Sequence, residues 1–574
     1  MPSENIDAAK KRLKRALEER GFVRGSEADR IAATSGRIKE DGWLFDVKNI
    51  LLEPLAMKDI ADIFWDSRTD TKTFQIGGLE TAGIPIVAAL IYSGATEHRR
   101  TDVTGFIVRK SRKKDGLMKF IEGLSDPKIP VILVDDLINA GSTKMREIAV
   151  LEAHGCTVSE IWTVVRFRDM SYYKAFEEKG IRIRSIFELN DFSETLDTAN
   201  MKEKGAKPYK EHFKTLWKFS SMKPNLHFVI AKSDPILDES RVYVGSDSGT
   251  MWALNQSDGS VAWSFKIGPQ PLFKGIFSSP AISGAMIFFG GYDGNFYALD
   301  KDTGKKRWMC FEADWIGSSP AIAEDLGLVF VGLEFGLFRK RGGIVAIDIK
   351  TGKKRWGFSE MPCFTHSSPL YIRRHRQVVI GSNDGAAYLF DAATGALVWK
   401  FDGGVLTEKA VDSGFSEYDV KESFAYDERR DMIIFGNTNG SLWFVDRRSG
   451  KSVGEFKAEF GFYSTPVIYK DTVLASSVDK NLYCVGLDTF AEKWRWNAGA
   501  RIFATPVVIG ESVYIGSNTG KLVEFDPETG AERSFALFSE RITNRVVFNP
   551  TTRRFFVPTF ANELYCIERI EPAA

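Results

Sequence analysis

A repeating pattern of short apolar strands and Gly/Asp turns begins after residue 225, and it constrains the fold more than any other feature of the chain. Three copies are VYVGSDSGTMWALNQSDGSVAW (242–263), IFFGGYDGNFYALDKDTGKKRW (287–308) and VVIGSNDGAAYLFDAATGALVW (378–399). Weaker copies begin at Val329, Ile433, Val473, Val513 and Phe555. A period of about 40–50 residues, with four short strands in each unit, is typical of β-propeller blades. The pattern therefore predicts an all-β propeller, most simply one with eight blades.

The end of each unit has its own pattern, x-D-x-x-T-G-x-x-x-W. Its Asp and Gly favour a tight turn, because Gly adopts positive φ at no steric cost, and the Trp is expected to pack between blades. This ending resembles the repeat of pyrroloquinoline-quinone (PQQ) type propellers. The quinone enzymes carry adjacent cysteines and a calcium site, and no adjacent pair occurs here, so we expect no PQQ. The turn carboxylates are interpreted as structural: Asp300, Asp348, Asp391, Asp446 and Asp526.

The two ends of the repeat region indicate how the ring closes. The last copy, RFFVPTFANELYCIERI (554–570), stops after three strands, whereas TLWKFSS (215–221) has the pattern of a single strand. Pairing the two segments would complete a blade and remove two exposed edges. We therefore predict a propeller domain over 213–574, closed by the strand at 215–221.

Residues 1–212 have a different texture, in which strand-like and helical segments alternate. GIPIVAALIYSG (83–94), VTGFIVRK (103–110), PVILVDD (130–136) and VSEIWTVVRF (158–167) are interpreted as buried strands or strand–helix units. STKMREIAVLEAHGC (142–156) and SYYKAFEEKGI (171–181) are interpreted as helices. Such alternation predicts an α/β domain with a mostly parallel sheet covered by helices.

The stretch VILVDDLINAGSTK (131–144) is the strongest functional motif of this first domain. Its strand delivers Asp135 and Asp136, and a loop of small residues then leads into a helix that starts near Ser142. Backbone N–H groups and a helix N-terminus converge on such a loop, which suits a phosphate. Carboxylates accept hydrogen bonds from ribose hydroxyls, so a sugar phosphate would satisfy both halves of the motif.

This stretch resembles the ribose-phosphate motif of type I phosphoribosyltransferases. Four other segments, in the same order along the chain, narrow the resemblance to the orotate phosphoribosyltransferase branch, over roughly residues 1–200. They are TSGRIKEDGWLFDVKNILLEP (34–54, base side), IGGLETAGIPIVAAL (76–90, pyrophosphate loop), FIVRKSRKKDG (106–116, catalytic loop) and VVRFRDM (164–170, the strand that ends in an Asp-Arg pair).

The resemblance implies a magnesium-dependent reaction in which a base displaces pyrophosphate from phosphoribosyl pyrophosphate (PRPP). Positive charge then develops on the sugar while an anion leaves, so stabilisation of the leaving group should dominate catalysis. The implied catalytic residues are Lys113, Arg109, Asp135 and Asp136. The implied pyrophosphate ligands are Glu80, Thr81, Ala82 and Gly83, with Arg109, Lys110 and Lys113. The implied 5′-phosphate ligands are Asn139, Ala140, Gly141, Ser142 and Thr143, and the implied base-binding residues are Arg168 and Thr34.

Three positions depart from the family pattern. Asp115 stands where the catalytic loop has His, Thr34 where the base-side segment has Lys, and Phe167 where the Asp-Arg pair has Asp. The acceptor base therefore stays open among orotate, a related pyrimidine and another nucleobase-like compound. A sensor that binds PRPP or a nucleotide without turnover is the alternative function.

Composition bears on the partners. A net charge of +1 gives no electrostatic case for nucleic acid or a membrane surface. Five dispersed cysteines without a CxxC motif fit a reducing compartment, and we expect a cytoplasmic protein. Family resemblance implies a homodimer through the first domain. Two long loops of the ring, 334–343 and 403–423, suggest that the propeller binds a partner.

Overall fold

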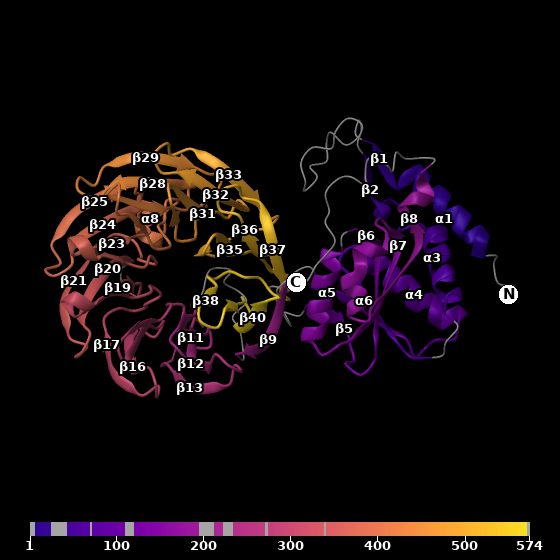
Figure 1. The fold of residues 1–574 in the computed structure, drawn as a ribbon, viewed down its shortest axis with the longest axis horizontal. Coiled ribbons are helices and arrows are strands. Elements are labelled where there is room, and N and C mark those ends of the chain that lie inside the picture. Colours follow the sequence, from indigo (N-terminus) through magenta and orange to yellow (C-terminus); the bar gives the residue numbers. More distant parts are fainter. Residues whose placement is uncertain are drawn as a thin grey trace. The chain divides into compact units, whose positions relative to one another are not determined.

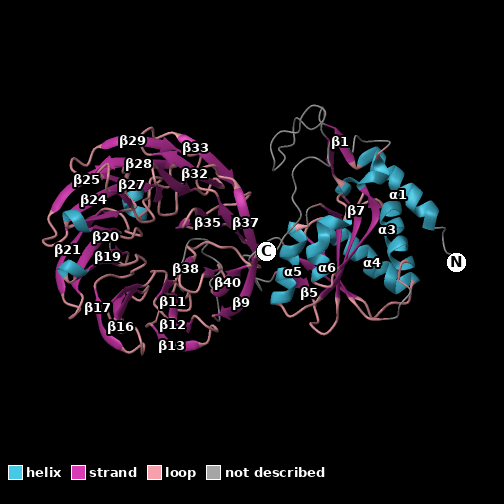
Figure 2. Cartoon of the chain, in the orientation of Figure 1, coloured by secondary structure: helices cyan, strands magenta, loops and turns pink. Residues whose placement is uncertain are grey.

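The computed structural model describes residues 6–24, 43–68, 72–109, 120–139, 141–193, 212–221, 233–269, 274–337 and 340–570. The chain divides into two compact units, an N-terminal domain consisting mainly of residues 1–211 and a C-terminal propeller that begins at residue 212 (Figures 1 and 2).

The N-terminal domain is built on a six-stranded sheet in the order β5–β4–β3–β6–β7–β8, which confirms the predicted α/β class. Its parallel strands are β3 (Gln75–Leu79), β4 (Thr104–Val108), β6 (Val131–Ile138), β7 (Val158–Arg166) and β8 (Arg182–Glu188), and β5 (Ile121–Gly123) pairs antiparallel with β4. The helices are α1 (Ile6–Arg20), α3 (Pro54–Asp66), α4 (Gly83–Glu97), α5 (Ser142–Ala153) and α6 (Lys174–Glu178). A separate antiparallel pair joins β1 (Phe22–Arg24) to β2 (Trp43–Phe45).

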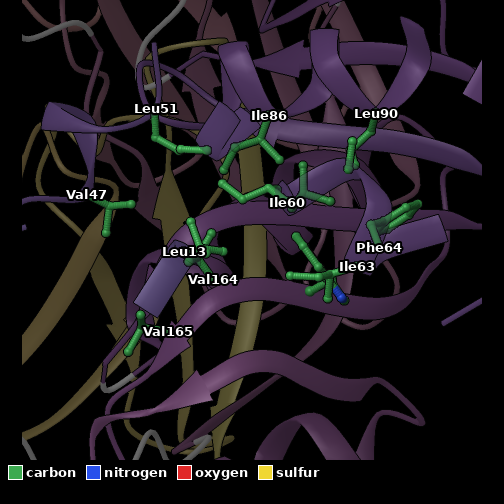
Figure 3. Packing of buried hydrophobic residues seen from close by; sticks show 14 of the residues in the cluster. Leu13, Val47, Leu51, Ile60, Ile63, Phe64, Ile86, Leu90, Val164 and Val165 are labelled. Atoms are coloured by element: carbon green, nitrogen blue, oxygen red, sulfur yellow. The ribbon is translucent and has the colours of Figure 1, made fainter. Parts of the chain in front are cut away.

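Alternation along the central strand β6 assigns its side chains to two separate cores. Ile132 and Val134 lie in a buried cluster with residues of α1, α3 and α4, among them Leu13, Ile60 and Ile86 (Figure 3). The intervening residues of β6 lie in a second cluster with α5 and α6. Because successive side chains of a strand point to opposite faces, the sheet is covered by helices on both sides.

The segment 83–94, expected as a buried strand or a strand–helix unit, is a helix. The segment GIPIVAALIYSG forms most of α4, and the strand before it is β3, which includes Gly77 and Gly78. A short apolar run does not by itself distinguish a buried strand from a buried helix. The glycines hide the true strand from a hydrophobicity pattern, yet they are required there. A Cβ on Gly77 would lie 2.9 Å from the ring of Phe106, and one on Gly78 would lie 2.6 Å from Val87.

The second unit is an eight-bladed propeller, as the repeat predicted, with a four-stranded antiparallel sheet in each blade (Figure 1). The first four blades are β10–β13 (Ile236–Leu237, Arg241–Gly245, Thr250–Asn255, Val261–Lys266), β14–β17 (Ala281–Ser283, Met286–Gly290, Asn295–Asp300, Lys306–Phe311), β18–β21 (Ala321–Ala323, Leu328–Phe335, Arg341–Asp348, Lys354–Met361) and β22–β25 (Leu370–Ile372, Gln377–Gly381, Ala386–Asp391, Leu397–Asp402). The next three are β26–β29 (Ala425–Asp427, Met432–Gly436, Ser441–Asp446, Ser452–Lys457), β30–β33 (Val467–Tyr469, Thr472–Ser476, Asn481–Gly486, Glu492–Asn497) and β34–β37 (Val507–Ile509, Ser512–Gly516, Lys521–Phe525, Glu532–Leu537).

The eighth blade closes the ring with strands from both ends of the repeat region. Its strands are β38 (Val547–Asn549), β39 (Arg554–Pro558), β40 (Glu563–Arg569) and β9 (Phe213–Ser220), and β9 pairs antiparallel with β40. The closing strand spans 213–220, so the expected bounds of 215–221 were too late, because the ladder continues to Phe213 opposite Arg569. Closure removes the two edges that an open array would expose.

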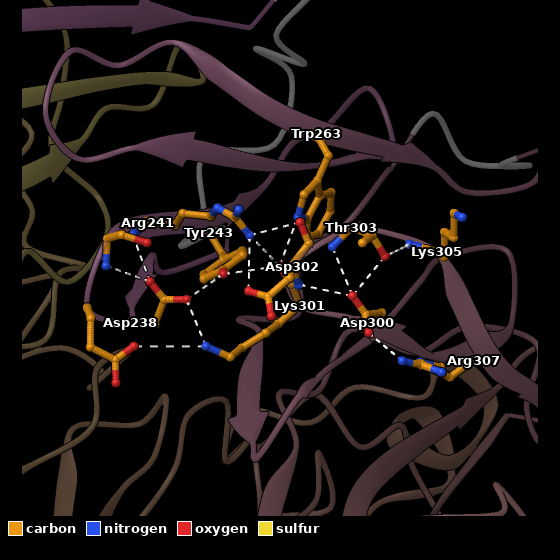
Figure 4. Close-up of polar contacts among 12 residues, drawn as sticks. Asp238, Arg241, Tyr243, Trp263, Asp300, Lys301, Asp302, Thr303, Lys305 and Arg307 are labelled. Carbon is orange, nitrogen blue, oxygen red and sulfur yellow. Dashed lines mark hydrogen bonds and ion pairs between the residues drawn. The ribbon is translucent and has the colours of Figure 1, made fainter.

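The ending shared by most units holds neighbouring blades together, and Figure 4 shows one example, around Trp263 and Asp300. The Asp300 carboxylate accepts hydrogen bonds from the backbone N–H and the hydroxyl of Thr303, at 2.9 and 2.7 Å, and so fixes the turn. Trp263 of the preceding blade donates its indole N–H to the carbonyl of Lys301 at 2.9 Å. The same Trp-to-turn bond recurs at Trp217, Trp308, Trp356, Trp399 and Trp494. The turn carboxylates are therefore structural, as expected.

Two further observations bear on the sequence-based expectations. All five cysteines are unpaired thiols. Among the described residues, no helix has both the length and the apolar character needed to cross a membrane.

Candidate functional site

The carboxyl edge of the parallel sheet gathers the segments that the sequence singled out. Strand β3 runs into Glu80, β4 into Arg109, β6 into Asn139 and β7 into Phe167 and Arg168. These four strands are neighbours and parallel, so their carboxyl ends meet at one edge of the sheet. Ligands of open α/β sheets bind in the crevice outside that edge.

The predicted pyrophosphate loop, Glu80–Gly83, folds back closely against its own strand. A Cβ on Gly83 would lie 2.8 Å from the Cα of Gly78, so only glycine permits the approach. The Glu80–Thr81 peptide bond is cis. Ala82 is the N-cap of α4 and offers no side-chain acceptor to the first turn. Since an uncapped helix N-terminus attracts anions, the backbone here suits a diphosphate.

Arg109 lies beside this loop at the end of β4. Its guanidinium is 3.9 Å from the Glu80 carboxylate and 3.6 Å from that of Glu122. The other predicted catalytic-loop cations, Lys110 and Lys113, and the departure at Asp115 fall outside the described residues. Arg109 is therefore the predicted leaving-group cation whose surroundings are known, and it adjoins the pyrophosphate loop.

The paired aspartates lie within β6 and follow its alternation. Asp135 points to the α5 side, where the buried ammonium of Lys144 forms an ion pair with it and also with Glu147, at 3.0 Å from Oε1. The other oxygen of Asp135 accepts a hydrogen bond from the backbone N–H of Asp136 at 2.9 Å. Burial alone would lower the pKa of Lys144, but the charges of Glu147 and Asp135 raise it. Both oxygens of Asp135 thus have protein partners, an arrangement that the sequence reasoning did not foresee.

Asp136 differs from Asp135 in its partners and in its pKa. Its Oδ1 accepts a hydrogen bond from the N–H of Leu137 at 2.9 Å. Burial, and then the neighbouring charge of Asp135, raise the pKa of Asp136 to about 7. Its environment therefore favours the protonated form more than that of an ordinary carboxyl does, and Asp136 is the member of the pair without a cationic partner among the described residues.

The predicted phosphate loop turns sharply into α5. Gly141 is the N-cap at φ +84°, and a Cβ there would lie 2.6 Å from the ring of Phe176, so glycine is required on both counts. Thr143 is exposed in the first turn. Ala140 and the side chain of Ser142 are outside the described residues. The loop geometry is that of an anion-binding helix N-terminus.

A small cavity of about 130 Å³ lies where β7 ends, next to the predicted base-binding residue Arg168. The Arg168 guanidinium lies over the ring of Tyr172, 5.6 Å from its centroid, and donates to Asn139. Arg166, which forms an ion pair with Glu188, also lines the cavity and was missed by the sequence reasoning. The sequence feature that could have identified Arg166 is its charge at the end of an otherwise apolar strand segment. Phe167 lines the cavity and packs edge-on against Phe45. Thr34 lies outside the described residues.

Comparison with known proteins relates the N-terminal domain to orotate phosphoribosyltransferases. The orotate phosphoribosyltransferase of Bradyrhizobium sp. (strain ORS 278) is 26% identical over 189 residues, which are 32% of this chain and 97% of that protein. The orotate phosphoribosyltransferase of Pyrococcus abyssi (strain GE5 / Orsay) is 29% identical over 163 residues, which are 28% of this chain and 84% of that protein. The similarity supports a phosphoribosyltransferase activity for the N-terminal domain.

Fold and site together define a protein that joins an orotate phosphoribosyltransferase-like α/β domain to a PQQ-like eight-bladed propeller. The chain belongs to the family described as outer membrane protein assembly factor BamB, whose family model matches residues 213–360 and 364–534, more than half of the chain. Among solved structures, the quinohemoprotein alcohol dehydrogenase of Comamonas testosteroni has a TM-score of 0.51 at 12% identity, covering 63% of this chain and 78% of that one. That likeness shows the fold alone.

Proposed function

We propose that the N-terminal domain transfers ribose 5-phosphate from PRPP to a pyrimidine-type base, orotate or a relative, with release of pyrophosphate. One observation carries the proposal: the pyrophosphate loop, Arg109, the phosphate loop and Arg168 follow four neighbouring parallel strands, in a domain similar to orotate phosphoribosyltransferases over nearly their whole length.

The leaving group makes the largest electrostatic demand. Charge builds on the departing diphosphate as its bond to the sugar breaks, so preorganised cations should lower the barrier most. Arg109, beside the pyrophosphate loop, supplies one such cation, and Lys110 and Lys113 would supply two more. Closure of the catalytic loop (106–116) would exclude water that otherwise hydrolyses the sugar.

The phosphate loop and Asp136 would hold the rest of PRPP. The uncapped start of α5 suits the 5′-phosphate, and an ionised Asp136 accepts hydrogen bonds from ribose hydroxyls. Mg²⁺ is usually held by substrate phosphates together with one or two carboxylates, and the donor set fits that mode. Asp136 offers one carboxylate beside the loop, whereas Asp135 is engaged by Lys144. We therefore expect Mg²⁺ to arrive bound to PRPP. We expect no PQQ in the propeller.

Base recognition would fall to the cavity beside Arg168. Its guanidinium can donate to a carbonyl or carboxylate of a planar base, and the adjoining rings of Phe167 and Tyr172 supply stacking surfaces. The volume of about 130 Å³ suits a single small ring.

A second candidate is a non-catalytic sensor of PRPP or a nucleotide. The ion pair between Asp135 and Lys144 favours it, because a carboxylate that already holds a buried ammonium has to give up that partner before it can steady a ribose. In this reading, binding would not lead to turnover.

The two candidates differ in a direct assay. Pyrophosphate release from PRPP is measured with a panel of pyrimidine and purine bases for wild type, Lys113→Ala and Asp135→Asn, with exposed Lys128→Ala as the matched control. The enzyme predicts release that falls at least about a hundredfold in Lys113→Ala, because a leaving-group cation is lost, and also falls in Asp135→Asn, but persists in the control. PRPP binding by calorimetry without release for any base would support the sensor. If neither PRPP binding nor pyrophosphate release were detected, both candidate functions would be rejected.

Association is proposed separately. We expect the N-terminal domain to form a homodimer and the propeller face to bind a protein partner, through the loops 334–343 and 403–423. Light scattering of the purified chain tests the first expectation, and a monomer at all concentrations would reject it.

A further inference from the structure

The propeller contains a cavity of about 300 Å³ on its axis, and every blade contributes to its lining. That volume lies at the lower end of the range for small-molecule sites. The aromatic residues of the wall are Phe277, Tyr292, Phe415, Tyr463 and Phe503. The ionisable residues of the wall, tyrosines apart, are Asp234, Lys274, His366, Lys421, Glu422 and Arg545. Both long loops reach this region. Phe415 and Glu422 of 403–423 line the cavity, and Glu334, the first residue of 334–343, lies 3.1 Å from the lining residue His366.

One repeat position shows how the lining is normally built. The residue three places before the first strand of a blade is Ser in most copies. In four blades its hydroxyl accepts a hydrogen bond from a glycine N–H of the next strand, at 3.0, 3.0, 3.0 and 3.2 Å. The serines of these four bonds are Ser233, Ser278, Ser318 and Ser367, and Ser464 occupies the same position in a fifth blade. The position is therefore structural in the repeat.

Glu422 replaces this serine in the blade β26–β29. Glu422 lines the cavity, and its backbone carbonyl accepts a hydrogen bond from the Ser367 hydroxyl at 2.6 Å, whereas its carboxylate makes no hydrogen bond or ion pair with any part of the chain that the structure describes. Burial, followed by the charge of Asp234, raises the pKa of Glu422 to about 8. The Glu422 side chain is only partly exposed, and a carboxylate held there without a partner costs free energy. The other blades place Ser, Ala504 or Asn544 at this position, so the acid at this one position indicates a role outside folding.

Two of the nearby basic groups, Lys421 and His366, lie against carboxylates. Lys421 forms an ion pair with Asp419 at 2.7 Å, and its ammonium lies 4.5 Å from the centroid of the Phe415 ring. His366 lies 3.1 Å from the Glu334 carboxylate. Lys274 lies over the ring of Tyr292, and the Glu334 charge acts on its pKa, although burial lowers that pKa overall.

Asp234 also has its own partners. It accepts hydrogen bonds from the backbone N–H of Arg545 at 2.9 Å and from the Asn544 side chain at 3.1 Å. The charge of Arg545 acts on Asp234 as well, although burial still raises the Asp234 pKa. Of the two acids that line the cavity, Glu422 is therefore the one whose carboxylate has no hydrogen-bond or ion-pair partner among the described residues.

We propose that this cavity binds a small organic amine with an aromatic or apolar body, its ammonium group against Glu422 and its body against the aromatic wall. An ammonium supplies the missing charge and hydrogen-bond donors, and aromatic faces attract both the cation and the apolar body. The proposal concerns the propeller and does not depend on the transferase function.

Calorimetric titration of the full chain at pH 8.5 tests the proposal. The probes are three arylalkylamines (benzylamine, 2-phenylethylamine and tryptamine), with 2-phenylethanol and phenylacetate as uncharged and anionic counterparts of the second. We expect at least one amine to bind, and 2-phenylethylamine to bind at least about tenfold more tightly than its alcohol. Binding should release a proton at pH 7, measured as a dependence of the heat on the buffer, because the cation favours the ionised form of Glu422.

Variants then locate the site. Glu422→Ser introduces the residue that other blades carry at this position and is expected to fold, and Glu422→Gln retains the shape of the side chain. Both should weaken amine binding at least about tenfold, whereas exposed Glu417→Gln in the same loop should not change it. The proposal is overturned if no amine binds, if Mg²⁺ or Ca²⁺ binds in place of the amines, if phenylacetate binds more tightly, or if both Glu422 variants bind as wild type does.

Discussion

The Nε–H of Arg168 donates a hydrogen bond to the Oδ1 of Asn139 at 3.0 Å. The first residue follows β7 and the second follows β6, so the bond links the predicted base-binding and phosphate-binding sides of the site. Tyr173 adds a second link, since its hydroxyl donates to the Asn139 carbonyl at 2.8 Å. Direct hydrogen bonds therefore connect the predicted base-binding and phosphate-binding sides.

This connection predicts non-additive effects on PRPP affinity. Arg168→Ala, Asn139→Ala and the double variant should show a coupling energy of about 0.5–3 kcal/mol, as contacting residues do. Calorimetric PRPP titrations measure it. The control cycle pairs Asn139→Ala with Arg184→Ala, because Arg184 on β8 interacts with Glu160 instead. Equal coupling in both cycles would argue against a direct link.

Removal of the buried Lys144 cation should reduce the local stability of the N-terminal domain. Lys144→Met leaves the Asp135 and Glu147 carboxylates buried without their cation, which should cost about 3–5 kcal/mol. Hydrogen exchange of peptides covering β6 and α5 measures the change. Lys58→Met breaks a pair with Asp62 in which the lysine is 45% exposed, so it should cost less than about 1 kcal/mol. Similar losses in the two variants would mean that burial of the Lys144 pair contributes little.

The seam between the first two blades predicts different costs for two glycine substitutions. Gly304 and Gly284 both have positive φ, at +69° and +55°. A Cβ on Gly304 would lie 2.7 Å from the Trp263 indole, whereas none of the described atoms lies within 4 Å of one on Gly284.

Gly284→Ala should therefore cost about 1–2 kcal/mol, the backbone penalty alone. Gly304→Ala should cost more, because it also displaces the Trp. Urea unfolding followed by Trp fluorescence compares the two variants. Equal midpoints would show that the Trp contact adds nothing to the backbone effect.

Glu422 predicts a pH-dependent stability of the propeller. Its pKa is about 8 in the folded chain against an ordinary value of 4.5. The folded state therefore binds more protons between these values, and stability falls as the pH rises from about 4.5 to about 8.

Near pH 4.5 we expect Glu422→Gln and wild type to have the same melting temperature, and at pH 9 we expect that of the variant to be several degrees higher. Thermal melts across this pH range measure the difference. Exposed Glu417→Gln should show no such divergence. A difference between wild type and Glu422→Gln that did not change with pH would point to packing instead of charge.

Much of the fold could be predicted from the sequence alone. The blades, the D-x-x-T-G turn and the closing strand depend on local backbone conformation and on which side chains are apolar, and these leave a periodic signature. The strand–loop–helix at Asp135 to Thr143 could also be predicted, because it too depends on local backbone conformation and on the apolar pattern. The residues alone left 83–94 open between a strand and a strand–helix unit, because two glycines obscured β3 and a short apolar run is compatible with either structure.

The pairing of charges between residues far apart in the sequence could not be predicted, because it leaves no periodic pattern in the sequence. Lys144 meets Asp135 only because α5 packs back on β6, and Glu422 shares a cavity with Asp234 only because eight blades close into a ring. Electrostatic interactions depend on distance and burial, and neither quantity exists along a linear chain. The chain's order of residues was therefore sufficient for architecture and motif, whereas the ionisation and availability of each acid were settled by packing.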